Sequence, residues 1–323
     1  DEDEAYIILF SNGRLDIVDQ SSPTTVAASI TSGCPWTNSH IGKITVAQSG
    51  DTMIITNSNF AMKKLTRTGA STFTLSDYEF FVDSGVKFAP YFKFVSSSIT
   101  VTPSGTSGSG ITLTASAAAF TSNMNGTYLR LVDSADTVRH ALITGYTSTT
   151  VVTVTLSGAI ANTNAITDFS EEVFSARRGY ARTAIFHDQR LVFGGSRDLP
   201  NHLFFSKTAD FFDFDVGTGL DNESIQIQIA ENQVSEIKAL ASLRHLTVFT
   251  SEQELFVPTT ENKPLTPATI TIKKQTSFGS GDVQPVEFDG AIEEVQGNDI
   301  LSALAGESGQ SIHAITSGIR RAA

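Results

Sequence analysis

Along most of this chain, apolar residues alternate with polar ones or form short runs that end at turn residues, which is the pattern of β-strands. The first apolar run covers residues 6–10, and Asn12-Gly13 separates it from a second run at residues 14–18. Asn-Gly tolerates the positive φ angles of a two-residue turn, so the two runs predict a β-hairpin.

The same pattern continues to about residue 95. Residues 43–48 and 52–56 flank Ser49-Gly50-Asp51 and predict a second hairpin, and residues 72–75 with 78–82 predict a third. Hairpins that follow one another so regularly are typical of a meander, a sandwich or a propeller.

Residues 96–168 have a different character, with few charges and strong alternation. They contain the Ser/Gly-rich segment 104–110, which predicts a flexible turn or linker. The expected strands lie at residues 111–114, 128–132 and 151–156. We interpret this part as a small all-β domain inserted into a larger one.

Residues 169–290 again consist of short apolar runs separated by turn residues, as residues 1–95 do, but with more charges and aromatic residues. Strands are expected at residues 184–186, 190–193, 202–206, 246–250, 254–257 and 269–275. Residues 234–240 fit a short helical turn or a strand. We therefore divide the chain into four segments. Residues 1–95 and 169–290 are the two parts of a propeller-like β domain, and residues 96–168 are the inserted β domain. Residues 291–323 are a C-terminal tail, which is either loose or a helix docked on another subunit. The predicted fold class is mostly β, with propeller-like antiparallel sheets and an inserted small β domain.

The amino-acid composition further limits the possible architectures and functions. Of 323 residues, 36 are Ser, 39 are Thr and 24 are Gly, which suits short strands and polar turns and excludes long helices as the main architecture. The net charge of −12 disfavours tight nucleic-acid binding through a basic face.

The single cysteine, Cys34, excludes an internal disulfide. No apolar run approaches the roughly 20 residues of a membrane helix, so no membrane span is expected. The acidic start without Met suggests that the chain is processed or part of something longer.

The sequence contains few candidates for catalytic or metal-binding residues. No two of the six histidines lie close enough in sequence for a local metal motif. His187-Asp188 fits either a catalytic base with its orienting carboxylate or a hairpin turn. Five carboxylates lie close together in the sequence, namely Asp210, Asp213, Asp215, Asp221 and Glu223. They fit either a Ca²⁺ site or the outward face of a strand whose Phe residues point inward. The EF-hand pattern of a Ca²⁺ site fails, because Gly217 stands where an oxygen ligand is needed. Neither a nucleophile elbow nor a phosphate loop is present.

Three basic pairs interrupt the acidic chain. They are Lys63-Lys64, Arg177-Arg178 and Lys273-Lys274. Dispersed pairs of this kind are expected on solvated strand faces or in salt bridges between subunits, and a ring of them could line a channel.

From residue 179 onward the sequence resembles a known family. The block GYARTAIFHDQRLVFGGS at residues 179–196 resembles a motif of the nozzle proteins, or tail tubular protein B-like proteins, of short-tailed (podovirus) bacteriophages. The resemblance continues at residues 203–208, 210–215, 243–258, 264–267 and 275–280, and earlier at 47–53, 65–67 and 110–131.

This resemblance implies a structural virion protein, located in the phage tail and assembled in the host cytoplasm. Family members form a hexameric ring below the portal and adaptor, continue the DNA channel, and anchor tail fibres or a needle. The expected partners are therefore further copies of this chain, adaptor or connector proteins, and fibre or needle proteins. DNA is expected to slide past an acidic lumen without specific binding, and the turns at Gly194-Gly195 or residues 217–219 could form a gate.

The resemblance implies no enzymatic activity: we expect no catalytic, cofactor-binding or metal-binding residue and no cofactor. The sequence departs from the family in length, because members are expected to have more strands before residue 1 and more blades after residue 290. Two other readings stay open. A carbohydrate-binding or depolymerising tail component predicts an aromatic groove with paired carboxylates, and a stand-alone bacterial propeller predicts a secretion signal in the complete gene.

Overall fold

The structure is a computed structural model that describes residues 5–230, 235–258, 265–282, 284–288, 291–294 and 320–322. Regular structure in these residues is almost entirely antiparallel β, and helix is limited to α1 (Asn38–Ile41) and one 3-10 turn (Ser122–Met124). None of the described helices is long and apolar enough to cross a membrane. The mostly β fold class is confirmed.

Three sheets are four-stranded meanders, in which strands adjacent in sequence are also adjacent in the sheet, as in a propeller blade. The first consists of β4 (Thr45–Ser49), β5 (Thr52–Thr56), β6 (Lys63–Gly69) and β7 (Thr72–Asp77). The second consists of β17 (Thr183–His187), β18 (Arg190–Gly194), β19 (His202–Phe205) and β20 (Ile225–Gln228). The third consists of β21 (Ile237–Ser242), β22 (Leu246–Thr250), β23 (Glu254–Val257) and β24 (Lys273–Thr276).

A three-stranded sheet precedes them and another follows. The N-terminal sheet is ordered β1 (Tyr6–Ser11), β2 (Arg14–Asp19) and β3 (Val26–Ile30). The last sheet is ordered β25 (Val286–Phe288), β26 (Ala291–Glu294) and β27 (Arg320–Ala322).

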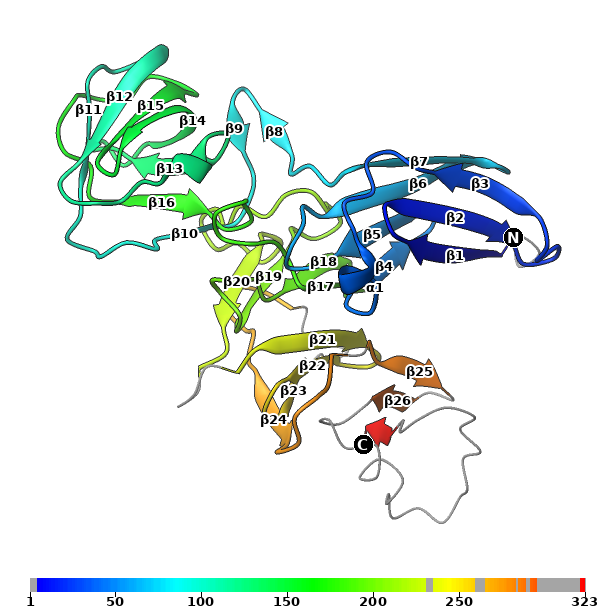
Figure 1. Ribbon diagram of the computed structural model, residues 1–323. Helices are drawn as coiled ribbons and strands as arrows, with labels where there is room; N and C mark the ends of the chain where they lie inside the picture. The colour runs from blue at the N-terminus through cyan, green and yellow to red at the C-terminus, as the bar shows by residue number, and fades with distance from the viewer. Residues whose placement is uncertain are drawn as a thin grey trace.

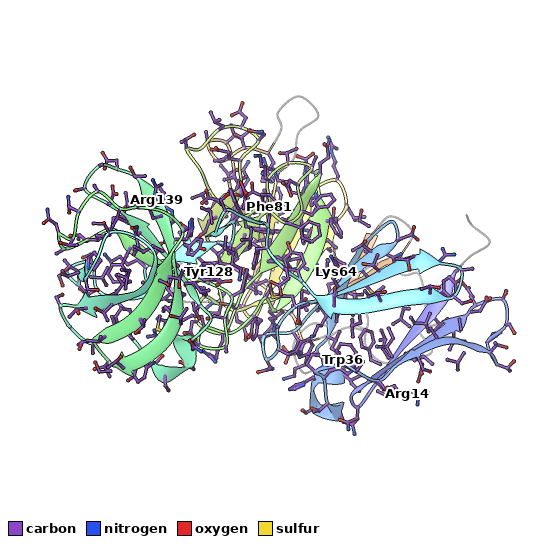
Figure 2. All side chains as sticks on the ribbon, turned by 90° about the horizontal axis from the view of Figure 1, so that it is seen from above. Arg14, Trp36, Lys64, Phe81, Tyr128 and Arg139 are labelled. Atoms are coloured by element: carbon purple, nitrogen blue, oxygen red, sulfur yellow. The ribbon has the colours of Figure 1, made fainter. Side chains whose placement is uncertain are left out.

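Neighbouring sheets pack face to face around shared apolar cores. Leu15 of β2 and Ile55 of β5 belong to one core, to which Trp36 also contributes (Figure 2). Phe193 of β18 faces the β4–β7 sheet, while Val192 beside it faces the β21–β24 sheet. The first strands of the three meanders also lie together, since β17 contacts both β4 and β21. Blades that meet along their first strands are the propeller-like arrangement that the sequence predicts.

The inserted domain is a seven-stranded sheet with its own core, and it projects to one side of the blades (Figure 1). Its strands, in sheet order, are β10 (Tyr91–Phe92), β16 (Phe169–Glu172), β13 (Tyr128–Val132), β14 (Val138–Ser148), β15 (Val151–Leu156), β12 (Ser109–Ala115) and β11 (Val101–Pro103). The sheet therefore extends a few residues beyond 96–168 on both sides. The paired strands β10 and β16 form the neck through which the chain enters and leaves the insert.

One local prediction in the first half was wrong. The third hairpin pairs β6 with β7, whereas residues 78–82 lead into a small hairpin of β8 (Val82–Asp83) and β9 (Val86–Lys87). Lys63–Gly69 was missed because its lysines and threonines hide the strand pattern. Segment 104–110 was predicted to be a turn or a linker, and the structure has the turn: the segment connects β11 and β12, and Ser109 is already paired with Thr155.

Three predictions in the second half were also refined. Residues 234–240 contribute a strand, β21, and no helical turn is described there. The strand expected at 269–275 is only Lys273–Thr276 long. In the expected tail, the structure describes two strands, β26 and β27, and the remaining residues of 291–323 lie outside the described part.

Arg190 is the most unusual core residue, because its guanidinium is almost fully buried at the start of β18. Its nitrogens donate to four carbonyl oxygens, at 2.7 Å from Ser206, 2.7 Å from Glu223, 3.0 Å from Asp221 and 3.2 Å from Leu265. Burial lowers its pKa, and the charge of Asp188 acts against this shift. One side chain thus fastens the loops around residues 221–223 and 265 to the blade.

Replacing Arg190 by Met is expected to lower the free energy of unfolding by about 3 kcal/mol or more, because four carbonyl oxygens lose their donor. The matched control is Arg14→Met, since Arg14 is 47% exposed and pairs only at the surface, where the loss should be much smaller. Urea unfolding of both variants measures this. Equal small losses would show that the buried guanidinium contributes little.

Candidate functional site

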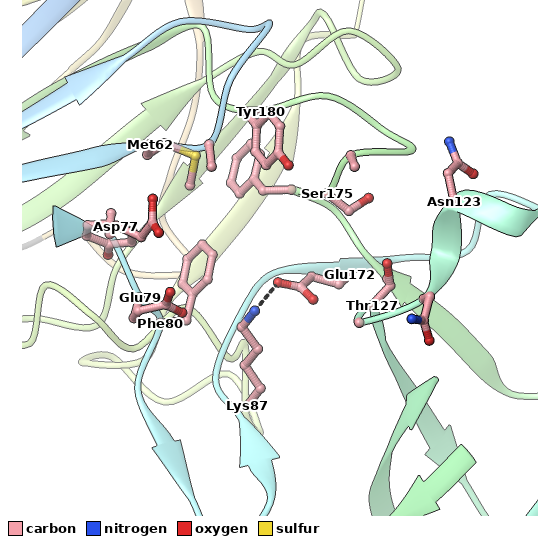
Figure 3. A pocket seen from close by; sticks show the side chains of 16 residues that line it. Met62, Asp77, Glu79, Phe80, Lys87, Asn123, Thr127, Glu172, Ser175 and Tyr180 are labelled. Atoms are coloured by element: carbon pink, nitrogen blue, oxygen red, sulfur yellow. Dashed lines mark hydrogen bonds and ion pairs between the residues drawn. The ribbon is translucent and has the colours of Figure 1, made fainter. Parts of the chain in front are cut away.

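A pocket of about 290 Å³ with the shape of a binding site lies between the insert and the blades. In Figure 3, Lys87 points toward Glu172, while Tyr180 and Ser175 lie on the blade side and Asn123 and Thr127 on the insert side. Three carboxylates and four aromatic residues line it, namely Asp77, Glu79, Glu172, Tyr78, Phe80, Phe174 and Tyr180. Such a mixture of acceptors, donors and ring faces suits a small polyhydroxylated or cationic molecule.

An ion pair is built into the wall of this pocket. Lys87 Nζ lies 2.5 Å from Glu172 Oε1 and also lies over the rings of Tyr128 at 5.3 Å and Phe80 at 5.7 Å. Glu172 Oε2 accepts a hydrogen bond of 3.3 Å from the backbone N–H of Tyr128. Burial raises the pKa of Glu172, and Lys87 opposes that shift. Both oxygens of Glu172 therefore have partners, so this carboxylate holds the wall together and is not a free acid or base.

The neck places these groups. Tyr91 of β10 lies opposite Glu172 of β16, and Phe92 lies opposite Glu171. Strand alternation sends the two glutamates to opposite faces of the neck. Glu172 thereby reaches the pocket, and Glu171 reaches a second charged cluster.

This second cluster locks the neck to the blade of β17–β20. Arg178 donates to Glu171 Oε2 from two nitrogens at 2.7 and 3.0 Å and to Asp198 at 3.2 Å, and its guanidinium carbon lies 3.9 Å from the ring centre of Phe94. Arg177 lies 3.5 Å from Glu171 and donates to the carbonyl of Ala119 in the insert. The two arginines are only 15% and 13% exposed. The expectation of a solvated face or a subunit salt bridge is wrong for this pair, because folding brings Glu171 to it.

The other two basic pairs lie apart from the neck. Lys63 pairs with Asp77, and Lys64 lies over the ring of Phe212 at 5.1 Å. Lys273 and Lys274 are exposed on the edge strand β24. In the described residues the three pairs therefore form no common basic surface.

Arg182 joins three blades at the place where their first strands meet. Its carbonyl accepts hydrogen bonds from Thr45 and Thr56 of the first meander, at 3.2 and 3.3 Å. Its guanidinium pairs with Glu236 and with Asp282, the latter at 2.6 Å.

Asp282 also receives Lys238 at 2.9 Å and Lys43 at 3.4 Å. Burial opposes its ionisation, but the hydrogen bond from Lys238 and the charge of Arg182 outweigh that effect and keep its pKa below the usual value. One carboxylate thus gathers Lys238 of β21 and two cations from the segments just before β4 and β17.

His187 and Asp188 lie at the turn between β17 and β18. The Nδ1 atom of His187 lies 2.8 Å from Ser242 Oγ, and burial lowers the pKa of this imidazole. Asp188 and Gln189 have φ angles of 48° and 59°, as a two-residue hairpin turn requires. The structure therefore has the hairpin turn that was one of the two interpretations.

The acidic cluster at residues 210–223 is not the strand edge that the alternation predicts. Residues 211–212 lie in a turn and residues 213–216 have no regular structure, and Asp213 is buried with its Oδ1 accepting from the N–H of Asp215. Glu223 folds back to cap the loop at Thr218 and Leu220. No group of three His, Cys, Asp or Glu residues suited to a metal ion is found in the described part of the chain. Gly194 and Gly195 are buried, so they form no exposed tip, whereas Gly217 and Gly219 lie on an exposed loop.

Sequence reasoning missed the pocket residues altogether. The one signal that could have drawn attention to the neck is the Glu171-Glu172 pair placed just before Arg177-Arg178, because four charges so close together in a weakly charged chain call for partners. Nothing local connects Lys87 or Glu79 to them.

No family model matches this sequence, and no curated protein matches it. Among solved structures, one similar chain is the phage phi92 endosialidase, with 11% identity and a TM-score of 0.27. The match covers 95% of this chain and 61% of that chain, so this chain spans less than two thirds of its length. A TM-score this low carries no argument about shared fold or activity, and the function is argued from the residues of this chain.

Replacing Arg178 by Met is expected to loosen the neck, because buried Glu171 keeps only the 3.5 Å contact with Arg177. Breaking a buried pair in this way costs about 3–5 kcal/mol. Hydrogen exchange in β10 and β16 should become faster, with the core of the insert unchanged. The matched control Arg197→Met, at a 56% exposed arginine that pairs with the same Asp198, should leave exchange unaltered. Unchanged exchange in Arg178→Met would exclude the lock.

Acid is expected to destabilise the protein through two buried histidines. Burial lowers the pKa of His140 and of His202 to about 4, from a usual value of 6.5. The stability that each contributes is fully present above pH 6.5 and is lost as the pH falls toward 4. His140→Leu should reduce the loss of unfolding free energy across this window by on the order of 2 kcal/mol, measured by urea unfolding at several pH values. A pH profile parallel to that of the unchanged protein would contradict this assignment.

Proposed function

We propose that this chain is a structural component of the tail of a short-tailed phage, forming part of a nozzle-like ring through which DNA passes. The proposal combines the family resemblance of the sequence with the positions that the resembling segments take in the fold.

The observation that carries the proposal is that two of these segments, residues 179–196 and 243–258, form joints between blades. Residues 179–196 contain the buried hairpin β17–β18, the interblade residue Arg182 and the clamp Arg190. Residues 243–258 contain β22 and β23, which share a core with β18 and β19. The pocket receives only Tyr180 from residues 179–196. Residues that maintain a scaffold, and not a reaction site, are what a tail-tube component needs.

The charge distribution is compatible with DNA sliding past. Six of the 22 Lys and Arg residues are engaged in the intramolecular pairs described at the neck, the pocket and the blade junction. Their charges are neutralised by neighbouring carboxylates, so the net charge of −12 is carried by surface that repels phosphate.

The test is assembly on the connector. The purified protein, mixed with a portal–adaptor complex of a short-tailed phage, is expected to bind it and to appear in negative stain as a ring with an open centre. Mass measurement by sedimentation gives the number of copies, for which six is expected. Heat-denatured protein and an unrelated acidic protein of similar size are the controls. A chain that stays monomeric and also fails to bind the connector would exclude the ring.

The pocket favours a second candidate, which is carbohydrate binding by the same tail component. Glu79 and the ring of Tyr180 line it on the blade side, and Asn123 and Thr127 add polar groups from the insert, as a sugar site requires. Titration with oligosaccharides from bacterial capsules, followed by calorimetry, tests this idea, and reducing-sugar release tests for depolymerisation. Binding that Glu79→Gln and Tyr180→Ala both abolish would support it. The absence of heat and of released sugar across the oligosaccharides would exclude it.

A further inference from the structure

The pocket between the insert and the blades contains one carboxylate whose charge is not compensated. Glu172 is paired with Lys87 in the pocket wall, and Asp77 is paired with Lys63. Glu79 is exposed and forms no ion pair or hydrogen bond with a described residue. Burial raises the pKa of Glu172, and the charge of Glu79 adds to that rise, so its field reaches the interior of the pocket. The pocket is therefore left with one negative charge.

Three hydroxyl groups of the same pocket have hydrogen-bonding capacity to spare. Thr127 is only 4% exposed, and its Oγ1 forms no hydrogen bond with a described residue. The hydroxyl of Tyr180 has no described partner either, and burial raises its pKa, so it stays a neutral donor. Ser175 Oγ accepts from the N–H of Arg178 at 3.2 Å, while its own O–H has no acceptor among the described residues. Because buried polar groups are normally hydrogen-bonded, these hydroxyls indicate a polar occupant, for which water is the minimal case.

The carboxylate and the hydroxyls lie on different walls of the pocket. In Figure 3, Glu79 lies to the left of Lys87, and Thr127 lies to its right. Tyr180 lies above them, and its ring is only partly buried, so one face is open to a ligand. A volume of about 290 Å³ holds one small molecule. A molecule that satisfies all of these groups has a positive charge at one end and hydroxyl groups around the rest.

The charge of the pocket selects among polar ligands. Phosphate, sulfate and acidic sugars would meet Glu79 without a free cation to offset it, because Lys87 is already paired. An ammonium group pairs with Glu79 instead, and an aromatic face favours a cation nearby. The pocket already holds one ammonium group in this way, since Lys87 pairs with Glu172 and lies 5.7 Å over the ring of Phe80.

We propose that this pocket binds an amino sugar whose amine is not acetylated, with its ammonium group on Glu79 and its hydroxyl groups on Thr127 and Ser175. The ring of Tyr180 covers the apolar face of the sugar. The inference rests on the proposed carbohydrate-binding function, for which it names the class of sugar. It does not depend on assembly into a ring.

A series of three monosaccharides tests the charge preference. Glucosamine, glucose and glucuronic acid are positive, neutral and negative at about pH 6. Ligand-observed NMR titration of the purified full chain gives the dissociation constant of each sugar. Glucosamine is expected to bind at least about tenfold more tightly than glucose, because its ammonium group makes a charge-assisted hydrogen bond, and glucuronic acid is expected not to bind. Glucuronic acid that binds as tightly as glucosamine would overturn the proposal.

Two substitutions test the assigned contacts. Glu79→Gln keeps the shape of the side chain and removes its charge, so glucosamine should then bind about as weakly as glucose. Thr127→Val removes the buried hydroxyl and should weaken both sugars by a similar factor of about threefold or more. The control Glu252→Gln removes an exposed carboxylate in the turn between β22 and β23 and should leave every affinity unchanged. A preference for glucosamine that survives in Glu79→Gln, or sugar binding that Thr127→Val leaves unchanged, contradicts the assignment.

The outcomes also separate this inference from the proposed function. If glucose and glucosamine bind equally well, the charge preference is wrong and carbohydrate binding stands. If no sugar binds, carbohydrate binding and this inference are both wrong, whereas the ring is judged by its assembly on the connector. Putrescine, an amine without hydroxyl groups, completes the comparison. If it binds as tightly as glucosamine, the hydroxyl contacts are wrong and the ligand is not a sugar.

Discussion

The blades of this protein depend on one residue, Arg182, at the point where three first strands converge. Its backbone carbonyl binds two threonines of the first meander, and its guanidinium binds Glu236 of the third meander and Asp282 beyond it. Because Lys43 and Lys238 share Asp282, the charges compensate one another at a junction that is only partly exposed to water. Blades held only by apolar faces could slide, since apolar packing has no direction. The hydrogen bonds of Arg182 fix their register.

The inserted domain is held differently. It has a complete core of its own, and the chain enters and leaves it through two short paired strands. A neck of two strands would allow motion, but the arginine cluster around Glu171 fixes one face of it and the Lys87–Glu172 pair fixes the other. The pocket exists because the insert and the blades are held at this fixed distance. A ligand bound in this pocket would contact both the insert and the blades.

The candidate site was the least predictable part of the chain. Sequence analysis weighed Arg177-Arg178, but it could not place Glu171 against them, since that contact depends on the turn that returns the chain after the neck. Lys87 and Glu172 are 85 residues apart, and only the folded insert between them brings them together. The acidic residues near 213 were predicted incorrectly for the opposite reason, because a local interaction decides their structure. The alternation of Phe and Asp predicts a strand, but the carboxylates of Asp210 and Asp213 accept hydrogen bonds from N–H groups two residues further on and form turns instead.

By itself, the sequence determined the local elements: most strands, the turns at Asn12-Gly13 and Asp188-Gln189, and the division into a β domain and a β insert. These follow from side-chain alternation and from backbone preferences, both of which act over a few residues. Only the tertiary structure decided which sheets share cores, which ion pairs lock the neck and where the pocket opens. Those features are contacts between segments far apart in the chain, and no local pattern of residue types encodes which distant partner a charge or a strand edge will meet.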